Sequence, residues 1–498
     1  MPRPVVFCLP AALLLMVPGF AAGEDKALEQ TLALQKVMQK VIAQAEPSIA
    51  CILVSRNEAY RRANGQTPSA DFSGKLGDFD PNKFDFPVED KSREDRRKFD
   101  LADPAHVPEA FGSGVVIDPQ GLILTNYHVI HDATKIFVRL PGGRAGYADI
   151  HAADPRSDLA VLRIGAKSQL PLPAVPLGDA TTAQRGQFVL TLSNPFAVGF
   201  RDGQPSASWG IISNLRRRIP GEPREEYRTK PLHYYGTLIQ TDTRLHLGCS
   251  GGALLNLSGE LIGLTTSLAA IHGGETPGGY AIPFDAGMRR ILDVLKRGEE
   301  VEYGFLGVSI NDQRPGRGKG VVLAYVYPGS PAEQEGHLRV DDVILAVNGI
   351  PLLESDDLFL HLGTQLVGTK VRLKVLQANT RGIATVDVTL GKLHVIGKTM
   401  ASSLGKRPFF RGLRVDYTTL LAQPQRLVPP GVLVSDVQAG TAAATAQLKP
   451  GEVITHVNQR AVTSPAAFYQ AVAALKGPIE LQLYNFGTYE APAKVLLK

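Results

Sequence analysis

The sequence predicts a mainly β protein that is built from several domains. At 498 residues the chain is too long for one hydrophobic core, so two to four domains are expected. Between Phe111 and Leu264, short apolar runs alternate with turn residues, and the whole chain holds 50 glycines and 35 prolines. This pattern is typical of short strands joined by turns. A segment that occurs twice in the C-terminal part indicates two copies of one small β-rich module.

The first residues predict export. Arg3 precedes an apolar stretch from Val5 to Phe20, and small residues follow it, so residues 1–23 have the features of a cleavable secretory signal. The alternative is an uncleaved membrane anchor. However, Pro10 and Pro18 interrupt the stretch, which is shorter than the roughly 20 residues that span a bilayer. We therefore expect an exported protein, periplasmic or secreted, without a stable membrane span.

The remaining composition excludes several classes of function. A net charge of +5 over this length gives a weak field, which argues against nucleic acid as the partner. The basic run 216–218 is diluted by nearby glutamates, so a solvated loop is expected there. After the signal only Cys51 and Cys249 remain; one disulfide is conceivable, but two free thiols are expected. Their spacing fits no metal site, and we expect no metal or cofactor.

The mature chain is expected to begin with a helix and a long loop. Apolar residues recur near a 3.6-residue period from Ala27 to Ala45, which predicts an N-terminal helix within residues 24–46. Pro47 ends it, and residues 48–54 predict a strand. Residues 55–109 are polar, charged and rich in proline, which indicates a long surface loop.

The rest of the first domain, expected to span residues 47–298, alternates strands with turns. Six apolar runs predict strands: 115–117, 122–124, 136–138, 159–164, 188–192 and 261–264. A basic, prolyl insertion covers residues 214–235, and a helix at about 284–296 closes the domain.

The segment Gly248-Cys249-Ser250-Gly251-Gly252 has the composition of a nucleophile turn. A serine hydroxyl is a weak nucleophile, so it needs a base and a polarised carbonyl. Glycines permit backbone angles that let the N–H groups of Gly248 and Ser250 converge on one point, where the oxyanion of a tetrahedral intermediate would lie. Each such donor contributes about 10²–10³ in rate. Taken alone, the segment also fits an ordinary glycine turn.

Two upstream segments supply the partners that such a serine needs. His128 ends the run Thr125-Asn126-Tyr127-His128, and Asp158 directly precedes the apolar run 159–164. The order His, Asp, Ser is that of the chymotrypsin-like β-barrels, rather than of subtilisin or the α/β-hydrolases. Asp154 is the competing carboxylate, but Asp158 precedes a strand that can fix a buried acid. His131 and His151 compete with His128 and are expected at the surface.

These segments resemble the high-temperature-requirement (HtrA/Deg) family of serine proteases. That family carries Thr-Asn-x-His-Val, Asp-Leu-Ala and Gly-Asn-Ser-Gly-Gly segments, followed by one or two PDZ domains. The resemblance covers nearly the whole mature chain and includes residues 239–242 and 279–283. It implies a chymotrypsin-like double β-barrel followed by two PDZ domains. It further implies a serine endopeptidase that degrades misfolded or unfolded exported proteins and forms a homotrimer or a higher oligomer.

The resemblance also implies roles for individual residues. His128 would remove the Ser250 proton, and Asp158 would hold the imidazole in the productive tautomer. Thr266 matches the family position whose hydroxyl supports the aspartate. Where the family has Asn or Asp, this chain has Cys249. The alternative function is therefore a weakly active or inactive protease that acts as a PDZ scaffold or chaperone.

Four positions bear on the substrate pocket: Thr266, Ser267, Leu268 and Arg244. Substrate backbone would pair with Ser267-Leu268, and Leu268 matches an apolar wall of the family's S1 pocket. Arg244 stands near the floor of that pocket in trypsin-like folds. An inward Arg244 would favour acidic residues; the other orientation points it to solvent or to an acid. We expect cleavage after Val, Ala or Leu.

The two repeats are expected to be PDZ domains at residues 299–396 and 405–498, joined by a linker near 397–407. In the first, the loop Tyr303-Gly304-Phe305-Leu306-Gly307 resembles the one whose N–H groups capture a C-terminal carboxylate, beside strand 308–310 and a helix near 356–365. In the second, Arg414 stands where we expect the loop's second glycine. Peptide capture by the second copy is therefore in doubt, and a role in assembly is the alternative.

Overall fold

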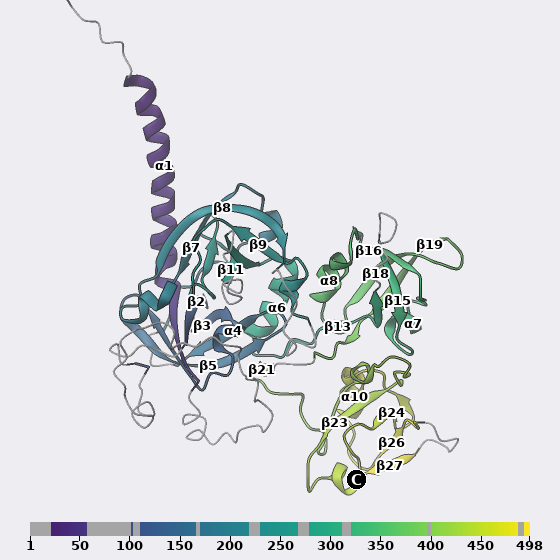
Figure 1. Cartoon of the computed structure of the whole chain (residues 1–498). Coiled ribbons are helices and arrows are strands. Elements are labelled where there is room, and N and C mark those ends of the chain that lie inside the picture. The colour runs from purple at the N-terminus through teal and green to yellow at the C-terminus, as the bar shows by residue number, and fades with distance from the viewer. Residues whose placement is uncertain are drawn as a thin grey trace, which may run out of the picture.

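The structure is a computed structural model that describes residues 21–56, 101–102, 110–165, 170–218, 230–266, 278–310, 320–395, 400–486 and 493–498. A helix projects from a double-barrel domain, and two smaller domains follow it (Figure 1). The predicted signal up to residue 20, most of the 55–109 loop and the centre of the 214–235 insertion lie outside the described residues. Within the described residues, no helix is long and apolar enough to cross a membrane.

The predicted N-terminal helix is present as α1 (Ala21–Ala45). Its last turns place Val41 and Ala45, both buried, in the core of the double-barrel domain, because apolar residues repeat along one face there. Its first turns stand away from the barrels, and Leu28 and Leu32 are exposed (Figure 1). Pro47 lies in the short 3₁₀ turn that ends the helix.

Six strands close the first barrel in the order β5-β4-β1-β2-β3-β6, with β5 and β6 paired. Their bounds are β1 Ile49–Ser55, β2 Ala110–Asp118, β3 Leu122–Asn126, β4 Lys135–Leu140, β5 Arg144–Asp154 and β6 Leu159–Ile164. The short helix α4 (Tyr127–Ile130) follows β3 directly.

The second barrel also has six strands, in the order β10-β11-β12-β9-β8-β7. Their bounds are β7 Phe188–Ser193, β8 Ser206–Arg217, β9 Leu238–Thr241, β10 Ala253–Leu255, β11 Leu261–Thr266 and β12 Gly279–Pro283. Helix α6 (Ala286–Lys296) closes the domain. The predicted double barrel is confirmed. The predicted apolar runs did not include β5, β8, β9, β10 and β12. Most residues of β8 are exposed or half-buried, and β10 has only three residues, which explains why apolar patterns missed these two.

The two C-terminal repeats are separate domains with separate cores. The first contains β13 Gly304–Phe305, β14 Val308–Ile310, β15 Val321–Val326, α7 Pro331–Gln334, β16 Val343–Val347, β17 Ile350–Pro351, α8 Ser355–Gly363, β18 Lys370–Leu376, β19 Ile383–Thr389 and β20 Gly391–Lys392. The second contains β22 Leu413–Tyr417, β23 Val432–Val437, α9 Ala442–Thr445, β24 Val453–Val457, β25 Arg460–Ala461, α10 Pro465–Val472, β26 Ile479–Leu483 and β27 Lys494–Leu497. Further 3₁₀ turns are η3 Ala180–Thr182, η4 Pro195–Phe200, η5 Leu232–Tyr234 and η6 Thr418–Leu421.

The linker between the repeats contributes a strand to the double-barrel domain. Within it, β21 (Ala401–Ser402) pairs with β5 of the first barrel. Beside β21, the Ser403 hydroxyl lies 2.9 Å from Nδ1 of His151, and His151 is buried. The expectation that His151 and His131 are surface residues is wrong, because both are buried. A distant segment covers His151, and no local sequence pattern reports that contact.

The first repeat also contacts the double-barrel domain through α8. Arg216, at the end of β8, forms an ion pair with the buried Asp357, and Tyr235 stacks on Phe359 at 4.3 Å between ring centroids. Burial alone raises the pKa of Asp357. The N–H groups of Leu353 and Glu354, together with the Arg216 guanidinium, outweigh it and lower that pKa. The carboxylate therefore stays ionised at neutral pH, which keeps the ion pair intact.

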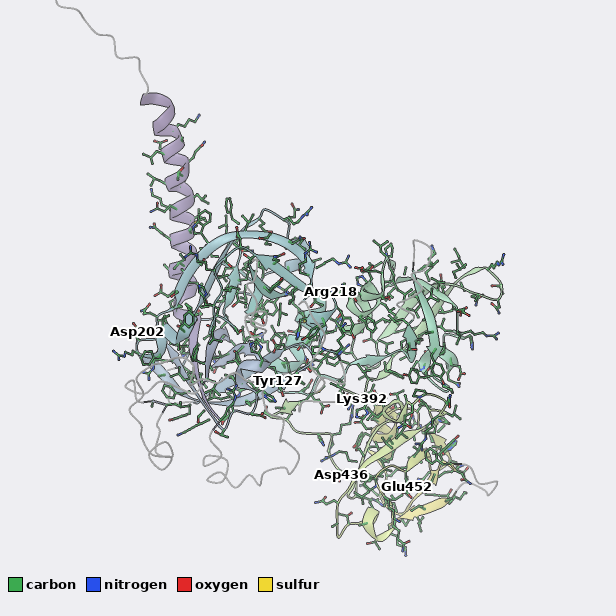
Figure 2. All side chains as sticks on the ribbon, in the orientation of Figure 1. Tyr127, Asp202, Arg218, Lys392, Asp436 and Glu452 are labelled. Atoms are coloured by element: carbon green, nitrogen blue, oxygen red, sulfur yellow. The ribbon has the colours of Figure 1, made fainter. Side chains whose placement is uncertain are left out.

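A cluster of charges joins the two repeats. Lys392 of β20, labelled at this junction in Figure 2, contacts Glu302 at 2.9 Å and Asp416 of β22 at 2.8 Å. Arg407 of the linker pairs with the same two acids. Burial alone lowers the pKa of Lys392, but the two carboxylates outweigh it and raise that pKa, so the ammonium stays charged. The cluster fixes the linker at Arg407 against β22.

Candidate active site

Three segments next to strand ends, one short helix and two turns, carry the candidate catalytic residues. His128 lies in α4 directly after β3, Asp158 lies in the turn between β5 and β6, and Ser250 lies in the turn between β9 and β10. The first two belong to the first barrel and the third to the second. Figure 2 labels Tyr127, which precedes His128, within the double-barrel domain.

The side chains of His128 and Asp158 are in direct contact. Nδ1 of His128 lies 2.8 Å from Oδ2 and 3.0 Å from Oδ1 of Asp158. The backbone N–H of His128 donates to Oδ1 as well, at 3.0 Å. A carboxylate only accepts hydrogen bonds, so Nδ1 carries the proton and Nε2 has a free lone pair in the neutral imidazole. The Asp158 side chain is 5% exposed and that of His128 is 16% exposed, which leaves access to the ring.

The backbone of Asp158 adopts an unusual conformation that its neighbours hold in place. Its φ of 58° lies in the left-handed region, which non-glycine residues seldom adopt. Its carbonyl oxygen accepts the N–H of Tyr127 at 3.0 Å and the side-chain amide of Asn126 at 3.1 Å. The turn before β6 is thus bonded to the residues on the N-terminal side of His128, which fixes the two partners relative to each other.

The Ser250 turn is fixed by strand β2 of the other barrel. The N–H of Ser113 donates to the Ser250 carbonyl at 2.8 Å, and the Ser113 hydroxyl donates to the Gly248 carbonyl at 2.7 Å. The same hydroxyl accepts the N–H of Asn194 at 2.8 Å. Ser113 is not among the site residues predicted from the sequence, where it stands in the triplet Gly112-Ser113-Gly114. The sequence feature that indicates this role is a small polar residue between two glycines near the start of a buried strand.

Close backbone contacts explain the glycines of this turn. Gly251 has a φ of +86°, and a Cβ there would lie 2.0 Å from the Ser113 carbonyl oxygen and 2.5 Å from the Thr125 hydroxyl. A Cβ on Gly112 would lie 2.6 Å from Val129 and 3.3 Å from the Ser250 carbonyl. The Ser250 turn therefore packs against Ser113 and Thr125, and Gly112 of β2 lies between the Ser250 carbonyl and Val129.

Gly248 has a geometry that suits an oxyanion donor. Its φ is +91°, and a side chain there would collide with the Asn194 carbonyl and the Phe111 ring. The Leu247 carbonyl accepts the N–H of Phe196 at 2.7 Å. Because the C=O and N–H of a trans peptide point in opposite directions, the N–H of Gly248 points away from Phe196. No backbone carbonyl among the described residues accepts that N–H.

Cys249 takes part in the turn as a hydrogen-bond acceptor. Its sulfur accepts the N–H of His246 at 3.3 Å, and its own N–H donates to the His246 carbonyl at 3.0 Å. Burial raises the pKa of this thiol and outweighs the hydrogen bonds from Ser193 and His246 that lower it. The expected free thiols are confirmed for Cys249 and Cys51, both buried, and burial raises the pKa of Cys51 to about 12. A neutral, buried thiol does not fit a cysteine nucleophile.

Asp154, the competing carboxylate, lies within hydrogen-bond reach of partners other than His128. It is fully buried and accepts the N–H of Ser157 at 2.9 Å and the hydroxyls of Ser157 and Tyr303 at 2.5 Å each. Arg156 lies over the Tyr303 ring, 4.2 Å from its centroid. Tyr303, expected to bind peptide in the first repeat, is 1% exposed and directs its hydroxyl into the double-barrel domain. Its side chain is therefore not available to a peptide.

The structure describes two of the four residues expected around the substrate pocket. Thr266 is buried, and its hydroxyl has no hydrogen-bond partner among the described residues, so the expected bond to Asp158 is not observed. The side chain of Arg244 is exposed, and its N–H lies 3.4 Å from the Ser208 hydroxyl. Ser267 and Leu268 lie outside the described residues. The neighbouring Leu245 packs on Gly279, where a Cβ would lie 2.3 Å from it.

The loops before β14 and β22 share a geometry that corrects one sequence prediction. Gly307 has a φ of +91° and packs against Ser330; Gly412 has a φ of +83° and packs against Thr441. Gly412 therefore occupies the place of the second glycine, and the assignment of Arg414 to that place is wrong. The carbonyls of these glycines accept equivalent N–H groups at 2.9 and 2.8 Å. Comparison of the two repeats along the sequence placed the second glycine at Arg414 instead of Gly412, because the residues that precede the two loops differ.

Comparisons with known proteins agree with this arrangement. A trypsin-like peptidase domain matches residues 112–264, and a PDZ domain matches residues 295–376 and 405–484. A probable periplasmic serine endoprotease, DegP-like, from Pseudomonas fluorescens is 32% identical over 454 residues, which cover 88% of each chain. The chain belongs to the DegP-like family of serine endoproteases. A second such relative, from Pseudomonas putida, is 31% identical over 92% of this chain and 91% of its own.

The DegP-like family fixes the enzyme class. The chain is a serine endopeptidase, and the names of its relatives confirm the predicted export to the periplasm. A DegP-like relative from Chlamydia muridarum is 30% identical over 94% of this chain and 90% of its own. A solved structure titled HtrA-type protease AlgW with tripeptide is 25% identical, with a TM-score of 0.49 over 71% of this chain and 96% of its own.

Proposed function

We propose that Ser250, His128 and Asp158 are the catalytic triad of this DegP-like endoprotease. The observation that supports this most strongly is the contact between Nδ1 of His128 and the Asp158 carboxylate at 2.8 Å. The contact fixes the tautomer in which Nε2 can accept a proton. Further support comes from Gly251, next to Ser250, where a Cβ would meet the hydroxyl of Thr125, three residues before His128.

The proposed reaction is acyl transfer through a covalent intermediate. Nε2 of His128 takes the Ser250 proton as Oγ attacks the scissile carbonyl, and the imidazolium then protonates the leaving amine. The N–H groups of Gly248 and Ser250 stabilise the oxyanion of each tetrahedral intermediate. Water attacks the acyl-enzyme by the same route in reverse. Asp158 stabilises the imidazolium throughout and keeps its own charge.

A fluorophosphonate probe tests the assignment of the nucleophile. Such probes phosphonylate a serine only when a base activates it, so we expect one modified peptide, with the label on Ser250. The labelled residue would be identified by tandem mass spectrometry of the full-length protein. The Ser250→Ala variant serves as the control and should remain unlabelled. A label on another serine, or an unlabelled protein that still cleaves casein, would contradict the proposal.

We further propose that the enzyme cleaves after small or medium aliphatic residues. The support is the exposed side chain of Arg244, together with the half-buried, apolar Leu245, which packs on Gly279. An apolar pocket without an inward cation disfavours acidic side chains. A peptide library profiled by mass spectrometry is expected to show Val, Ala and Leu at the cleaved position. A profile dominated by Asp or Glu would overturn this preference.

The proposed substrates are unfolded or misfolded exported polypeptides. The relatives are named periplasmic endoproteases, and an extended chain can pair with strand edges at the active site and at a PDZ domain. We propose that β14 and the Gly304–Gly307 loop of the first PDZ domain, which we call PDZ1, bind peptide C-termini. A homotrimer or a higher oligomer is proposed from the family resemblance.

A further inference from the structure

The second PDZ domain, which we call PDZ2, has the same two elements that form a peptide groove in PDZ1. Its first strand, β22, is at the end of its sheet and pairs with β23, and α10 packs against it. In PDZ1 the matching elements are β14 and α8. PDZ domains bind a peptide C-terminus by adding it as a strand to such an edge, beside the helix. The edge of β22 is therefore where a peptide would bind to PDZ2.

In PDZ2 the chain itself already bonds to this edge. The N–H of Leu413, the first residue of β22, donates to the Phe410 carbonyl at 2.9 Å. The N–H of Phe410 donates back to the Leu413 carbonyl at 2.8 Å. Both backbone groups of Leu413 are thus used within the chain. We call the residues that precede β22, Arg407–Phe410, the closing segment.

Tyr469 of α10 holds the closing segment from the helix side. Its hydroxyl donates to the Pro408 carbonyl at 2.9 Å and accepts the N–H of Val415, on β22, at 3.5 Å. One hydroxyl therefore connects the helix, the closing segment and the strand. Burial raises the pKa of Tyr469, which keeps the phenol protonated and able to donate. An added peptide strand would need the Val415 N–H that Tyr469 occupies.

Side-chain contacts add to the backbone bonds that hold the closing segment. The Phe410 ring contacts the buried Phe468 of α10 edge to face, with 6.4 Å between centroids. Arg414 donates from Nε to the Arg407 carbonyl at 2.8 Å, and its guanidinium lies 3.9 Å from the centroid of Phe409. The Glu302 and Asp416 carboxylates bind the Arg407 guanidinium, and the Leu413 backbone binds that of Phe410. The closing segment is therefore fixed at both its first and its last residue.

The part of PDZ1 that the structure describes shows no such closure. Counted from the residue before each helix, Glu354 and Ser464, the counterpart of Tyr469 is Phe359, which has no hydroxyl. Phe359 instead stacks on Tyr235 of the protease domain. Within the described part of PDZ1, no hydrogen bond links β14 to α8. The two repeats share a fold and differ in whether their own chain occupies the groove.

We propose that the groove of PDZ2 is occupied by the closing segment Arg407–Phe410, clasped by Tyr469, so that C-terminal peptides bind at PDZ1 and not at PDZ2. This rests on the proposed function of PDZ1 as a peptide receptor. It assigns PDZ2 an internal ligand, the linker of its own chain. Through the pairing of β21 with β5 and the ion pair between Arg407 and Glu302, the same linker is anchored to the protease domain and to PDZ1.

Photo-cross-linking on the full-length Ser250→Ala variant tests this inference, since that variant cannot cleave the probe by the proposed mechanism. The probe is a fluorescein-labelled, alanine-rich decapeptide with benzoylphenylalanine near its end and a free C-terminal valine; its amidated form controls for carboxylate recognition. We expect cross-links in PDZ1 and none in PDZ2. In the Ser250→Ala/Tyr469→Ala double variant, cross-links to β22 or α10 should appear and raise the labelling from about one to about two probes per chain.

Tyr484→Ala is the matched control, because it removes another tyrosine of PDZ2 and leaves the Pro408 bond intact; it should gain no second site. Cross-links to PDZ2 while Tyr469 is present, or a folded Tyr469→Ala variant without a new site, would overturn the inference. Should that variant not fold, amide exchange on the intact chain decides: the Leu413 and Val415 amides should be protected, and peptide should leave them unchanged. Fast exchange of these two amides, or protection that they gain when peptide is added, would refute the proposed occupation of the PDZ2 groove. Absence of cross-links from both domains would contradict the proposed role of PDZ1 and thus the assignment.

Discussion

Replacement of Ser250 by alanine is expected to reduce kcat on casein by at least about 10⁴-fold, because the substitution removes the atom that forms the acyl-enzyme. The turn itself should persist. Ser250 accepts the N–H of Ser113 through its backbone carbonyl at 2.8 Å, and alanine keeps that group. The expected signature is therefore a loss of turnover with substrate binding and thermal stability nearly unchanged, measured by single-turnover kinetics and by circular dichroism.

The exposed Ser258, in the turn between β10 and β11, offers a matched control. Ser258→Ala makes the same chemical change a few residues away and should keep full activity. A Ser250→Ala protein that cleaves casein at the unsubstituted rate would refute the nucleophile assignment. Equal inactivity of Ser258→Ala would show that the assay reports folding rather than chemistry. Inactivity of the unsubstituted chain, with Ser250 unlabelled by fluorophosphonate, would favour the scaffold alternative.

Replacement of Asp158 by asparagine is expected to lower kcat by about 10⁴-fold while the protein stays folded. The asparagine carbonyl can still accept the His128 N–H that now donates to Oδ1 at 3.0 Å. Its amide, however, donates to Nδ1 and forces the ring proton onto Nε2. Nε2 then cannot accept the Ser250 proton. The rate should be measured with a fluorogenic peptide, and the tautomer by ¹⁵N chemical shifts of the imidazole.

Asp132 provides the control for this variant. It pairs with His131 at 3.2 Å and is 46% exposed, so Asp132→Asn changes a nearby His–Asp contact of similar chemistry. That variant should stay within about twofold of the unsubstituted rate, because exposed pairs contribute little. If Asp158→Asn had no greater effect than Asp132→Asn, the proposed orienting role of Asp158 would be wrong.

Cys249 raised the possibility of an inactive scaffold, and the structure weakens it. The sulfur accepts the His246 N–H, a bond that orders the turn from within. Ser113 and Thr265 order it from outside, through the carbonyls of Gly248 and Cys249 at 2.7 and 2.6 Å. Because these bonds use backbone acceptors, they do not depend on which side chain precedes the serine. The departure at Cys249 therefore leaves the geometry of the turn intact.

The sequence by itself determined the class of fold, the enzyme class and the residues proposed for catalysis. Strands of alternating or continuous apolar character, such as β3 and β6, follow from local patterns, and the glycines around Ser250 are required by the turn itself. Successive side chains of a β-strand point to opposite faces of the sheet, so the order of apolar and polar residues along the chain indicates which face is buried. The order of His128, Asp158 and Ser250 along the chain is likewise a sequence property that distinguishes one protease architecture from another.

Only the tertiary structure decided which polar side chains form hydrogen bonds with residues that are distant in the sequence. Tyr303 was expected to face a peptide and instead bonds Asp154, 149 positions earlier, while His151 is covered by Ser403. The closing segment of PDZ2 depends on Tyr469, about 60 residues beyond Pro408. Contacts of this kind form where separate elements fold against each other, and no spacing along the chain encodes them. The physical reason is that hydrogen bonds and burial depend on distance in space, which the chain fixes only after folding.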